Sequence, residues 1–532
     1  MKRAARRPHR SATPYSAPAN NSNIKMKFGI LPLATLLLGP SVPSPAAQIK
    51  PPTRPNIVFI IADDLGIGDV SCYGATMIKT PNLDRLATQG MRFLDAHASA
   101  SVCTPSRYGI LTGRDYWRIT KEWEGQLCVE PERPTVAKTL RAAGYSTGYF
   151  GKWHLGWGNS DPGKRRSNRA DWDWNAATLA PGVLETGYDT FFGTPFSANE
   201  PPLIFVKDRT MVGRDPADPL IVVDPKVEKY YGYGTSKGAA AAHAARPLDQ
   251  IDRIVTGKAV AYIETHKDKP FYLHLALVAP HVPIAPAKDF QGRTAVGPYG
   301  DFVEQMDDCV GRLLAAIDKA GITDNTLVIF TSDNGAILSK DVRATGHRSN
   351  ANLLGQKTDA WEGGVNIPFF ARWPGKIPAG TVCGRLLSLN DFYATACAVA
   401  GTPIPEGAAP DSINELDVLE NPDAPAARKE MTYLAIEKPG VALRDGDWVY
   451  LPGQGSFGVT TDPTMTWAMQ FNDCGFVNSD YDASGHLKAD APKVQLYNLK
   501  QDPDQTTNLA ASNPEKTREL AARLAVIRAE KK

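Results

Sequence analysis

The stretch NIVFIIADDLG, residues 56–66, decides the fold class of this 532-residue chain. Residues 56–61 form a continuous run of apolar and β-branched side chains that is too short for a helix and is soon followed by Asp63 and Asp64. Continuous apolar runs are typical of strands buried on both faces of a parallel sheet, because one-sided burial produces alternation instead. The stretch therefore predicts a buried parallel strand with two carboxylates at its carboxyl end.

Three later runs repeat this pattern, with helical periodicity between them, for example over 302–320. Alternating strands and helices predict an α/β fold: a large, mainly parallel sheet covered by helices. Ligands of such sheets bind outside the carboxyl ends of the strands. One polar strand end could be a solvated turn, but four together indicate a site. The later strand ends are Gly151-Lys152-Trp153-His154, Pro280-His281 and Asp333-Asn334-Gly335.

The composition of the sequence changes after about residue 400. Residues 401–428 are rich in Pro, Ala, Glu and Asp and read as a linker or surface crossing. Residues 441–450 contain two short strands around an Asp-Gly turn, which is a hairpin signal, and 517–531 has the composition of an amphipathic helix. We expect an N-terminal extension and signal peptide over 1–47, a main domain over 48–430, and a small C-terminal α+β subdomain with an antiparallel sheet over 431–532.

The first 47 residues have the sequence pattern of a signal peptide. Lys25 and Lys27 precede an apolar run over 28–38, and small residues follow. The run is shorter than the roughly 20 residues that cross a bilayer, so we expect export to the periplasm or the medium without a stable membrane anchor. This segment holds seven basic and no acidic side chains; the rest has 52 basic against 57 acidic ones, a net charge of −5. Such a chain has no general affinity for nucleic acid.

The acidic strand ends suggest a metal site. Asp63, Asp64, Asp333 and Asn334 offer hard oxygen ligands, a set that suits Ca²⁺ or Mg²⁺ better than Zn²⁺. Adjacent carboxylates would repel each other unless a cation lay between them. The seven cysteines show no CxxC or Cys/His cluster, so neither a thiolate metal site nor a dense disulfide framework is expected.

Cys103 is the one cysteine for which we expect a special role. Pro105 is suited to the first turn of a helix, which places Cys103 at the positive helix end and Arg107 one turn further on. That position would favour a thiolate nucleophile. However, metal-binding carboxylates are an unfavourable setting for a thiolate, and no His lies nearby in sequence. The residues alone therefore leave its chemistry open.

Taken together, these motifs resemble the type I sulfatases, whose signature cysteine is oxidised to formylglycine. Within that family the chain looks most similar to the arylsulfatase A and N-acetylgalactosamine-6-sulfatase branch. The resemblance covers nearly the whole chain after the signal peptide and rests on motifs in the same order. The motifs are NIVFIIADDLG at 56–66, CTPSR at 103–107 with LTGR at 111–114, GKWH at 151–154, PH at 280–281, SDNG at 332–335 and GQKTDAWEGG at 355–364.

The resemblance implies a hydrolase that releases inorganic sulfate. Asp63, Asp64, Asp333, Asn334 and the converted Cys103 would bind one Ca²⁺. A formylglycine-generating enzyme would convert Cys103 into an aldehyde, whose hydrate has one hydroxyl that attacks sulfur and a second whose deprotonation expels sulfate. The resemblance also implies roles for the remaining site residues: Arg107, Lys152 and Lys357 around the sulfonyl oxygens, His154 as a base, His281 (with Lys152 and Lys357) against the substrate, and Ser197 as a neighbouring hydroxyl.

A sulfated carbohydrate is the substrate that we expect. The loop over 157–174 combines aromatic and basic side chains suited to sugars and anions, although a solvated loop is an equal reading; 343–350, with His347 and Arg348, is a second candidate. Two alternatives stay open. One is a phosphodiesterase or phosphonate monoester hydrolase of the same alkaline-phosphatase-like fold. The other is an inactive relative that binds glycans with calcium.

Overall fold

The computed structural model describes residues 54–119, 127–130, 132–158, 172–223, 236–436, 440–465 and 467–530. Within them, the largest sheet has ten strands in the order β13-β2-β12-β11-β1-β10-β4-β5-β6-β7. Its five central strands, β11 to β5 in that order, are parallel, whereas β12, β6 and β7 pair antiparallel to their neighbours. The strands are β1 Asn56–Asp63, β2 Met91–Phe93, β4 Ser146–Lys152, β5 Thr190–Thr194, β6 Val206–Lys207, β7 Thr210–Met211, β10 Phe271–Pro280, β11 Thr326–Ser332, β12 Phe369–Arg372 and β13 Thr381–Cys383.

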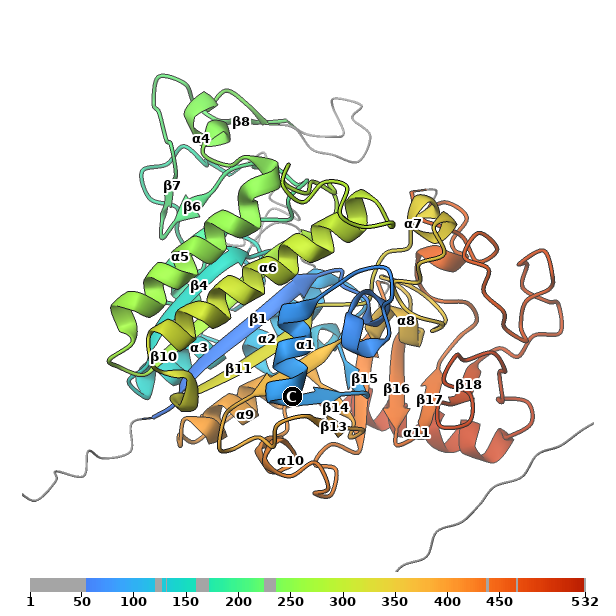
Figure 1. Cartoon of the computed structure of the whole chain (residues 1–532). Coiled ribbons are helices and arrows are strands. Elements are labelled where there is room, and N and C mark those ends of the chain that lie inside the picture. Colours follow the sequence, from blue (N-terminus) through green and yellow to red (C-terminus); the bar gives the residue numbers. More distant parts are fainter. Residues whose placement is uncertain are drawn as a thin grey trace, which may run out of the picture. The chain divides into compact units, whose positions relative to one another are not determined.

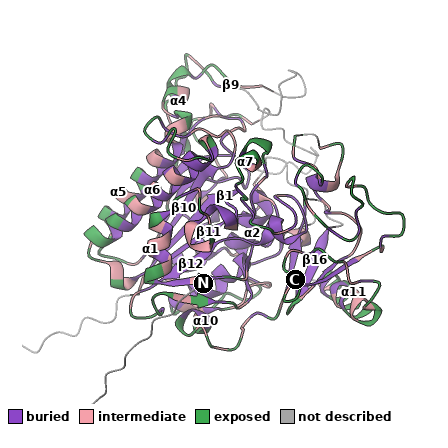
Figure 2. Ribbon diagram, turned by 45° about the vertical axis from the view of Figure 1, so that its right-hand side comes forward, coloured by how far each residue is buried: buried purple, intermediate pink, exposed green. Residues whose placement is uncertain are grey.

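Helices cover both faces of this sheet (Figure 1). On one face, α6 buries Val303, Met306, Val310 and Leu313, which recur every three or four residues as an apolar stripe requires. All eight residues of β1 are buried, as its continuous apolar run predicts (Figure 2). The predicted α/β fold is therefore confirmed. The helices on the α6 face are α1 Pro81–Gln89, α5 Ile251–His266 and α6 Pro298–Lys319; those on the other are α2 Cys103–Thr112, α3 Val136–Ala142 and α9 Phe392–Val399.

A second, antiparallel sheet of four strands forms the C-terminal part, in the order β15-β16-β17-β18. The predicted hairpin is present as β16 and β17, with Gly446 at φ 54° in its turn. Leu520 and Leu524 of the last helix, α11, pack against this sheet. The helix begins and ends slightly before the predicted 517–531. The elements are β15 Glu430–Leu434, β16 Val441–Asp445, β17 Trp448–Leu451, β18 Gln495–Asn498 and α11 Pro514–Ala529.

The segment over 401–428 is more than the surface crossing that its composition indicates. It contains the short helix α10 (Leu416–Glu420), and Arg428 forms a buried ion pair with Asp391. All seven cysteines lie in the described part of the chain, and none forms a disulfide there. Within the same part, no helix has both the length and the apolar composition needed to cross a membrane. The boundaries at 47 and 430 stay predictions, and residues 1–47 lie outside the described residues.

The remaining described elements are short. They include β3 (Ala96–His97), which pairs with β14 (Leu387–Ser388), and β8 (Ile221–Val222), which pairs with β9 (Ser236–Lys237). Three short helices complete the described α-helices: α4 Ala240–Ala244, α7 Lys340–Ala344 and α8 Glu362–Val365.

Candidate active site

The carboxyl ends of β1, β4, β10 and β11 meet at one edge of the large sheet. β1 ends with Asp63, and Asp64 follows in a left-handed conformation at φ 64°. β4 ends with Lys152, one residue after Gly151, where a Cβ atom would lie 1.7 Å from the Ala276 carbonyl oxygen of β10. Only glycine permits this close approach of β4 to β10. The predicted convergence of the strand ends is therefore present.

Three cations contact the three carboxylates in this cluster. Lys152 Nζ lies 2.7 Å from Asp63 Oδ2. Arg107 donates from Nη2 to Asp333 Oδ2 at 2.7 Å, and Lys357 Nζ lies 2.8 Å from Asp64. Lys357 has the most exposed side chain of the six, at 12%, and the others are at most 3% exposed. Buried charges of opposite sign thus compensate one another.

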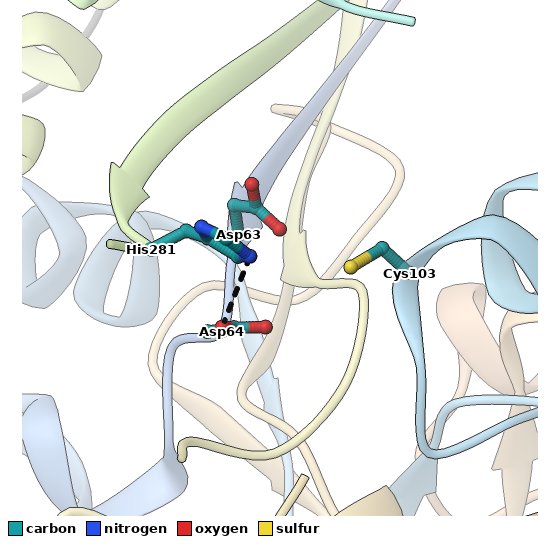
Figure 3. A group of neighbouring side chains, drawn as sticks. All are labelled: Asp63, Asp64, Cys103 and His281. Atoms are coloured by element: carbon teal, nitrogen blue, oxygen red, sulfur yellow. Dashed lines mark ion pairs between the residues drawn. The ribbon is translucent and has the colours of Figure 1, made fainter. Parts of the chain in front are cut away.

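Cys103 is the first residue of α2 and points its sulfur toward the aspartates (Figure 3). One ligating atom from each of Asp63, Asp64, Cys103 and His281 lies within 4.8 Å of the others. Asp333 is not in this group, since Arg107 engages its Oδ2 while its Oδ1 accepts a hydrogen bond from the Asp64 backbone N–H at 3.2 Å. Three of the predicted ligands, Asp63, Asp64 and Cys103, thus form one group with His281, while Asp333 and Asn334 contact Asp64 beside it.

Two buried oxygens in the cluster indicate room for a cation. Asp63 Oδ1 and Asn334 Oδ1 have no hydrogen-bond partner among the described residues. Asn334 directs its amide nitrogen to Asp64 Oδ1 at 2.7 Å, so its own oxygen is the atom left over. Buried acceptors without partners are rare unless an ion or water satisfies them. The donor set, all oxygens apart from Cys103 and His281, fits a hard divalent cation.

The electrostatics of the cluster do not favour a thiolate. Burial raises the pKa of Cys103 to about 12, despite the nearby Lys152 and Lys357. Burial and the adjacent Asp63 raise the pKa of Asp333 to about 7. Burial also acts to raise the pKa of Asp63, but Lys152 and its other cationic neighbours hold it well below the usual range. Low thiol acidity thus overrides the helix-end effect expected from the sequence, and an unmodified Cys103 would be a poor nucleophile.

The two candidate histidines have different surroundings. His154, at φ 59°, has its Nε2 2.9 Å from Glu200 Oε2. His281 donates from Nδ1 to the Val282 carbonyl at 2.6 Å, so in the neutral ring Nε2, 3.7 Å from Asp64, is the acceptor nitrogen. Burial and then Lys357 lower the pKa of His281. Sequence reasoning missed Glu200, although it lies only three residues after Ser197.

Ser197 lies beside this pair. Its backbone N–H donates to Glu200 Oε2 at 3.3 Å, and its buried Oγ has no hydrogen-bond partner among the described residues. Ser197 therefore lies beside the His154–Glu200 pair, and its hydroxyl has no partner that would compete with a ligand.

The two specificity loops differ from the expectation. Within 157–174, Trp157 and Trp174 are buried in the core and cannot present a ring face to a sugar; Trp172, half-buried, packs over Gly158. Residues 159–171, with all the basic side chains considered, lie outside the described residues. His347 is also buried, with Nε2 2.7 Å from Asp69, which makes it a structural residue, whereas Arg348 is exposed.

The C-terminal sheet contacts the backbone on both sides of the site. The Ser101 N–H donates to the Leu434 carbonyl at 2.8 Å, and the Thr358 N–H donates to the Ser101 carbonyl at 2.7 Å. Ile436 N–H donates in turn to the Thr358 carbonyl at 3.0 Å. Thr358 Oγ1 accepts from the Val459 N–H at 2.9 Å. The neighbours of Cys103 and Lys357 are thus joined to each other and to the small sheet.

Comparison of the chain with protein-family models identifies its family. The sulfatase family model matches residues 55–402, which contain every site residue described above. The chain belongs to the sulfatase family. It is an enzyme of a family that hydrolyses sulfate esters, and the binding-protein alternative is set aside.

Individual relatives agree with this sulfatase assignment. An N-acetylgalactosamine-6-O-sulfatase of Bacteroides thetaiotaomicron is 32% identical and aligns with 94% of this chain and 98% of its own length. Mouse steryl-sulfatase is 34% identical over 70% of this chain and 66% of its own length. A solved Bacteroides thetaiotaomicron sulfatase, described with the metabolism of multiple glycosaminoglycans, has a TM-score of 0.76 at 32% identity and covers 90% of this chain and 100% of its own.

Proposed function

We propose that this sulfatase releases inorganic sulfate from a sulfated carbohydrate, using a formylglycine made from Cys103 and one bound Ca²⁺. The observation that carries the proposal is the meeting of Cys103 with buried, partly unpartnered oxygen ligands at one sheet edge. Its substrate class rests on the bacterial relative that is named for a sulfated sugar. A steroid or simple aryl sulfate is the competing substrate, since steryl-sulfatase is also a relative.

The cation would be held by the strand-end oxygens of Asp63, Asp64, Asp333 and Asn334, next to the converted residue 103. Ca²⁺ suits this set better than Mg²⁺, because it accepts several protein oxygens without demanding a strict octahedron. When bound, the ion would polarise oxygens of the sulfate and of residue 103. It would also offset the repulsion from Asp63, which, after burial, is the second cause of the raised pKa of Asp333.

Conversion of Cys103 removes the difficulty of its high thiol pKa. The hydrated aldehyde supplies one hydroxyl for attack on sulfur and a second hydroxyl through which sulfate can leave. A formylglycine-generating enzyme is the partner that must act before the site is complete. The chain's own contribution is to hold this residue at the amino end of α2, a position favourable to an oxyanion.

The surrounding side chains stabilise charge, transfer protons and bind the substrate. Lys152 and Lys357 stabilise negative charge on the sulfonyl oxygens, and Arg107 fixes Asp333 and the cation ligands around it. His154, oriented by Glu200, accepts the proton whose removal lets sulfate leave. His281 faces the cluster with Nε2 and, once protonated, donates to the leaving oxygen. Ser197 offers a hydroxyl to the substrate beside His154.

Mass spectrometry of the tryptic peptide 93–107 from the native host tests the nucleophile. We expect the aldehyde form at position 103; an unmodified thiol in active enzyme would contradict the mechanism. Parallel turnover of p-nitrophenyl sulfate and p-nitrophenyl phosphate separates this function from the phosphodiesterase alternative. A screen of sulfated mono- and disaccharides then identifies the substrate.

We also propose that the protein is exported, on the grounds of the signal-peptide pattern before residue 47. Amino-terminal sequencing of the mature protein from the culture medium or periplasm tests this. An intact N-terminus on protein confined to the cytoplasm would contradict it.

A further inference from the structure

A short turn over 197–200 forms one side of the site. Glu200 N–H donates to the Ser197 carbonyl at 3.0 Å and closes the turn, while Glu200 Oε2 lies 2.9 Å from His154 Nε2. The His154 N–H donates to the Pro195 carbonyl at 3.0 Å. The turn is therefore fixed directly against the residue that we propose as the base.

A guanidinium from a distant segment reaches this turn. Arg246, between α4 and α5, donates from Nη2 to the Ala198 carbonyl at 2.9 Å and is only 7% exposed. Its Nε is buried without a partner, and no carboxylate among the described residues forms an ion pair with it. Burial lowers the pKa of Arg246 to about 10, which leaves it cationic at neutral pH. A buried cation without a counter-ion is unfavourable unless a ligand supplies the negative charge.

The turn and its surroundings contain further unpartnered polar atoms. Ser197 Oγ, Asn199 Oδ1 and His243 Nε2 are all buried without a hydrogen-bond partner among the described residues. Natural proteins leave few such atoms, and each requires an explanation. Ser197 and Asn199 flank the Ala198 carbonyl that Arg246 contacts, so a single polar ligand at this turn would satisfy their oxygens together with the guanidinium.

We propose that Arg246 binds a second anionic group of the substrate, a carboxylate or another sulfate, while the sulfate to be cleaved occupies the strand-end site. A guanidinium suits both groups, because its donors match the oxygens of carboxylate and sulfate. Ser197 and Asn199 then bind hydroxyl groups of the same sugar unit. Glu200, the acid of the turn, is occupied by His154. This inference rests on the proposed sulfated carbohydrate and narrows it to one with at least two anionic groups.

The test compares substrates within each variant. Purified, formylglycine-containing enzyme is assayed with p-nitrophenyl sulfate, with N-acetylgalactosamine 6-sulfate, with its disulfated form and with a uronic-acid-linked 6-sulfated disaccharide. We expect kcat/KM of the wild type to be higher for a doubly anionic sugar than for the singly sulfated one. Arg246→Gln should lower that preference about tenfold, chiefly through KM, as loss of a charge-assisted hydrogen bond requires. Arg246→Lys should retain part of it.

Arg253→Gln is the matched control, because this arginine lies in the first turn of α5 and its guanidinium pairs with Asp289 instead. It should leave the substrate preference unchanged. Should Arg246→Gln fail to fold, methyl esterification of the uronate tests the wild type directly and should raise KM about tenfold. A wild type without preference for a second anionic group, or one indifferent to esterification of the uronate and to removal of the second sulfate, would overturn the proposal. Failure to hydrolyse p-nitrophenyl sulfate and every sulfated sugar would instead refute the proposed function.

Discussion

The two sheets contribute to the site by different means. At the edge of the large sheet, the strands end directly in reactive side chains, such as Asp63, Lys152 and Asp333. The small sheet instead supplies backbone hydrogen bonds, which fix Ser101 and Thr358 beside Cys103 and Lys357. The chemistry therefore depends on the side chains of one sheet, whereas the positions of two of its residues depend on the other. The effects of substitutions in the two regions should accordingly differ in size and in whether they act on turnover or on stability.

Loss of the nucleophile should have the largest effect. Cys103→Ala leaves no residue that can be converted to the aldehyde, so sulfate release, measured by ion chromatography, should fall to the uncatalysed background. Calcium binding should remain measurable by calorimetry, because the four strand-end oxygen ligands are intact. Cys309→Ala, which removes a buried thiol of α6 far along the chain, is the matched control and should retain turnover. Sulfate release by the Cys103→Ala enzyme would refute the assignment.

Removal of the cation should come next. Chelation leaves Asp63, Asp64 and Asp333 close together with only the three cationic side chains to offset them. We expect activity to fall at least about tenfold, as it does when metal affinity is weakened in comparable sites, and to return with Ca²⁺. The melting temperature should fall and recover in parallel, since a ligand of the folded state stabilises it.

The variant Asn334→Ala tests whether Asn334 is one of the ligands of this cation. The variant loses one of the two buried oxygens that have no other partner, so its melting temperature should respond less to Ca²⁺ than that of the wild type. An equal calcium response in the two proteins would remove Asn334 from the ligand set.

The large sheet and its site residues could be predicted from the sequence, because both follow from local patterns. A continuous apolar run marks a buried strand, and its polar end marks the edge where parallel strands meet. Glu200 and Arg246 reach the site from segments without such a pattern, so only the fold brings them there. The prediction of a sugar-binding loop was wrong for the opposite reason. Trp157 and Trp174 are of the residue type that sugar-binding surfaces use, but both are buried in the core.

The role of the small sheet was equally hidden from the sequence. Its hairpin is predicted by the Asp-Gly turn, but nothing in residues 430–436 indicates that their backbone pairs with the segment before Cys103. Asp252 is a similar case: from α5 it accepts the N–H groups of Val278 and Ala279, and so fixes the end of β10 before His281. Contacts between backbone and distant side chains leave little trace in composition or spacing.

A substitution at Thr358 tests whether Val459, in the segment between β17 and β18, helps to position the site. Thr358→Ala loses the hydrogen bond from Val459 N–H and should lower kcat on p-nitrophenyl sulfate about tenfold through displacement of Lys357, with a smaller change in KM. Thr358→Ser keeps the hydroxyl and should restore most of the rate, which a purely hydrophobic packing role would not. Thr265→Ala, on the surface of α5, is the control. A Thr358→Ala enzyme with wild-type kcat would show that the Val459 hydrogen bond does not position Lys357.

Substitution of Glu362, where β16 meets α8, should have the smallest effect on turnover. Its main effect should be on the stability of the fold. Glu362 accepts from His97 Nε2 at 2.8 Å, in a buried cluster that Arg444 of β16 also approaches. Burial opposes the charged form of Glu362, but His97 and Arg444 hold its pKa at about 2, and Glu362 raises the pKa of His97. A depressed carboxyl pKa stabilises the fold fully above its unfolded value, near 4.5, and this stabilisation is lost as the pH falls toward 2. The raised pKa of His97 acts in the other direction, since its contribution is present below its unfolded value and is lost as the pH rises through the folded one.

Urea unfolding of the wild type and of Glu362→Gln, compared from pH 6 to pH 3, measures this contribution of Glu362. The variant should be less stable at pH 6 by a few kcal/mol, roughly the cost of breaking a buried ion pair. The gap should narrow toward pH 3, because only the wild type loses the charge of Glu362 there. Other acids titrate in both proteins and cancel in the difference. A gap that stays constant over this range would mean that the charge of Glu362 does not stabilise the fold through His97 and Arg444.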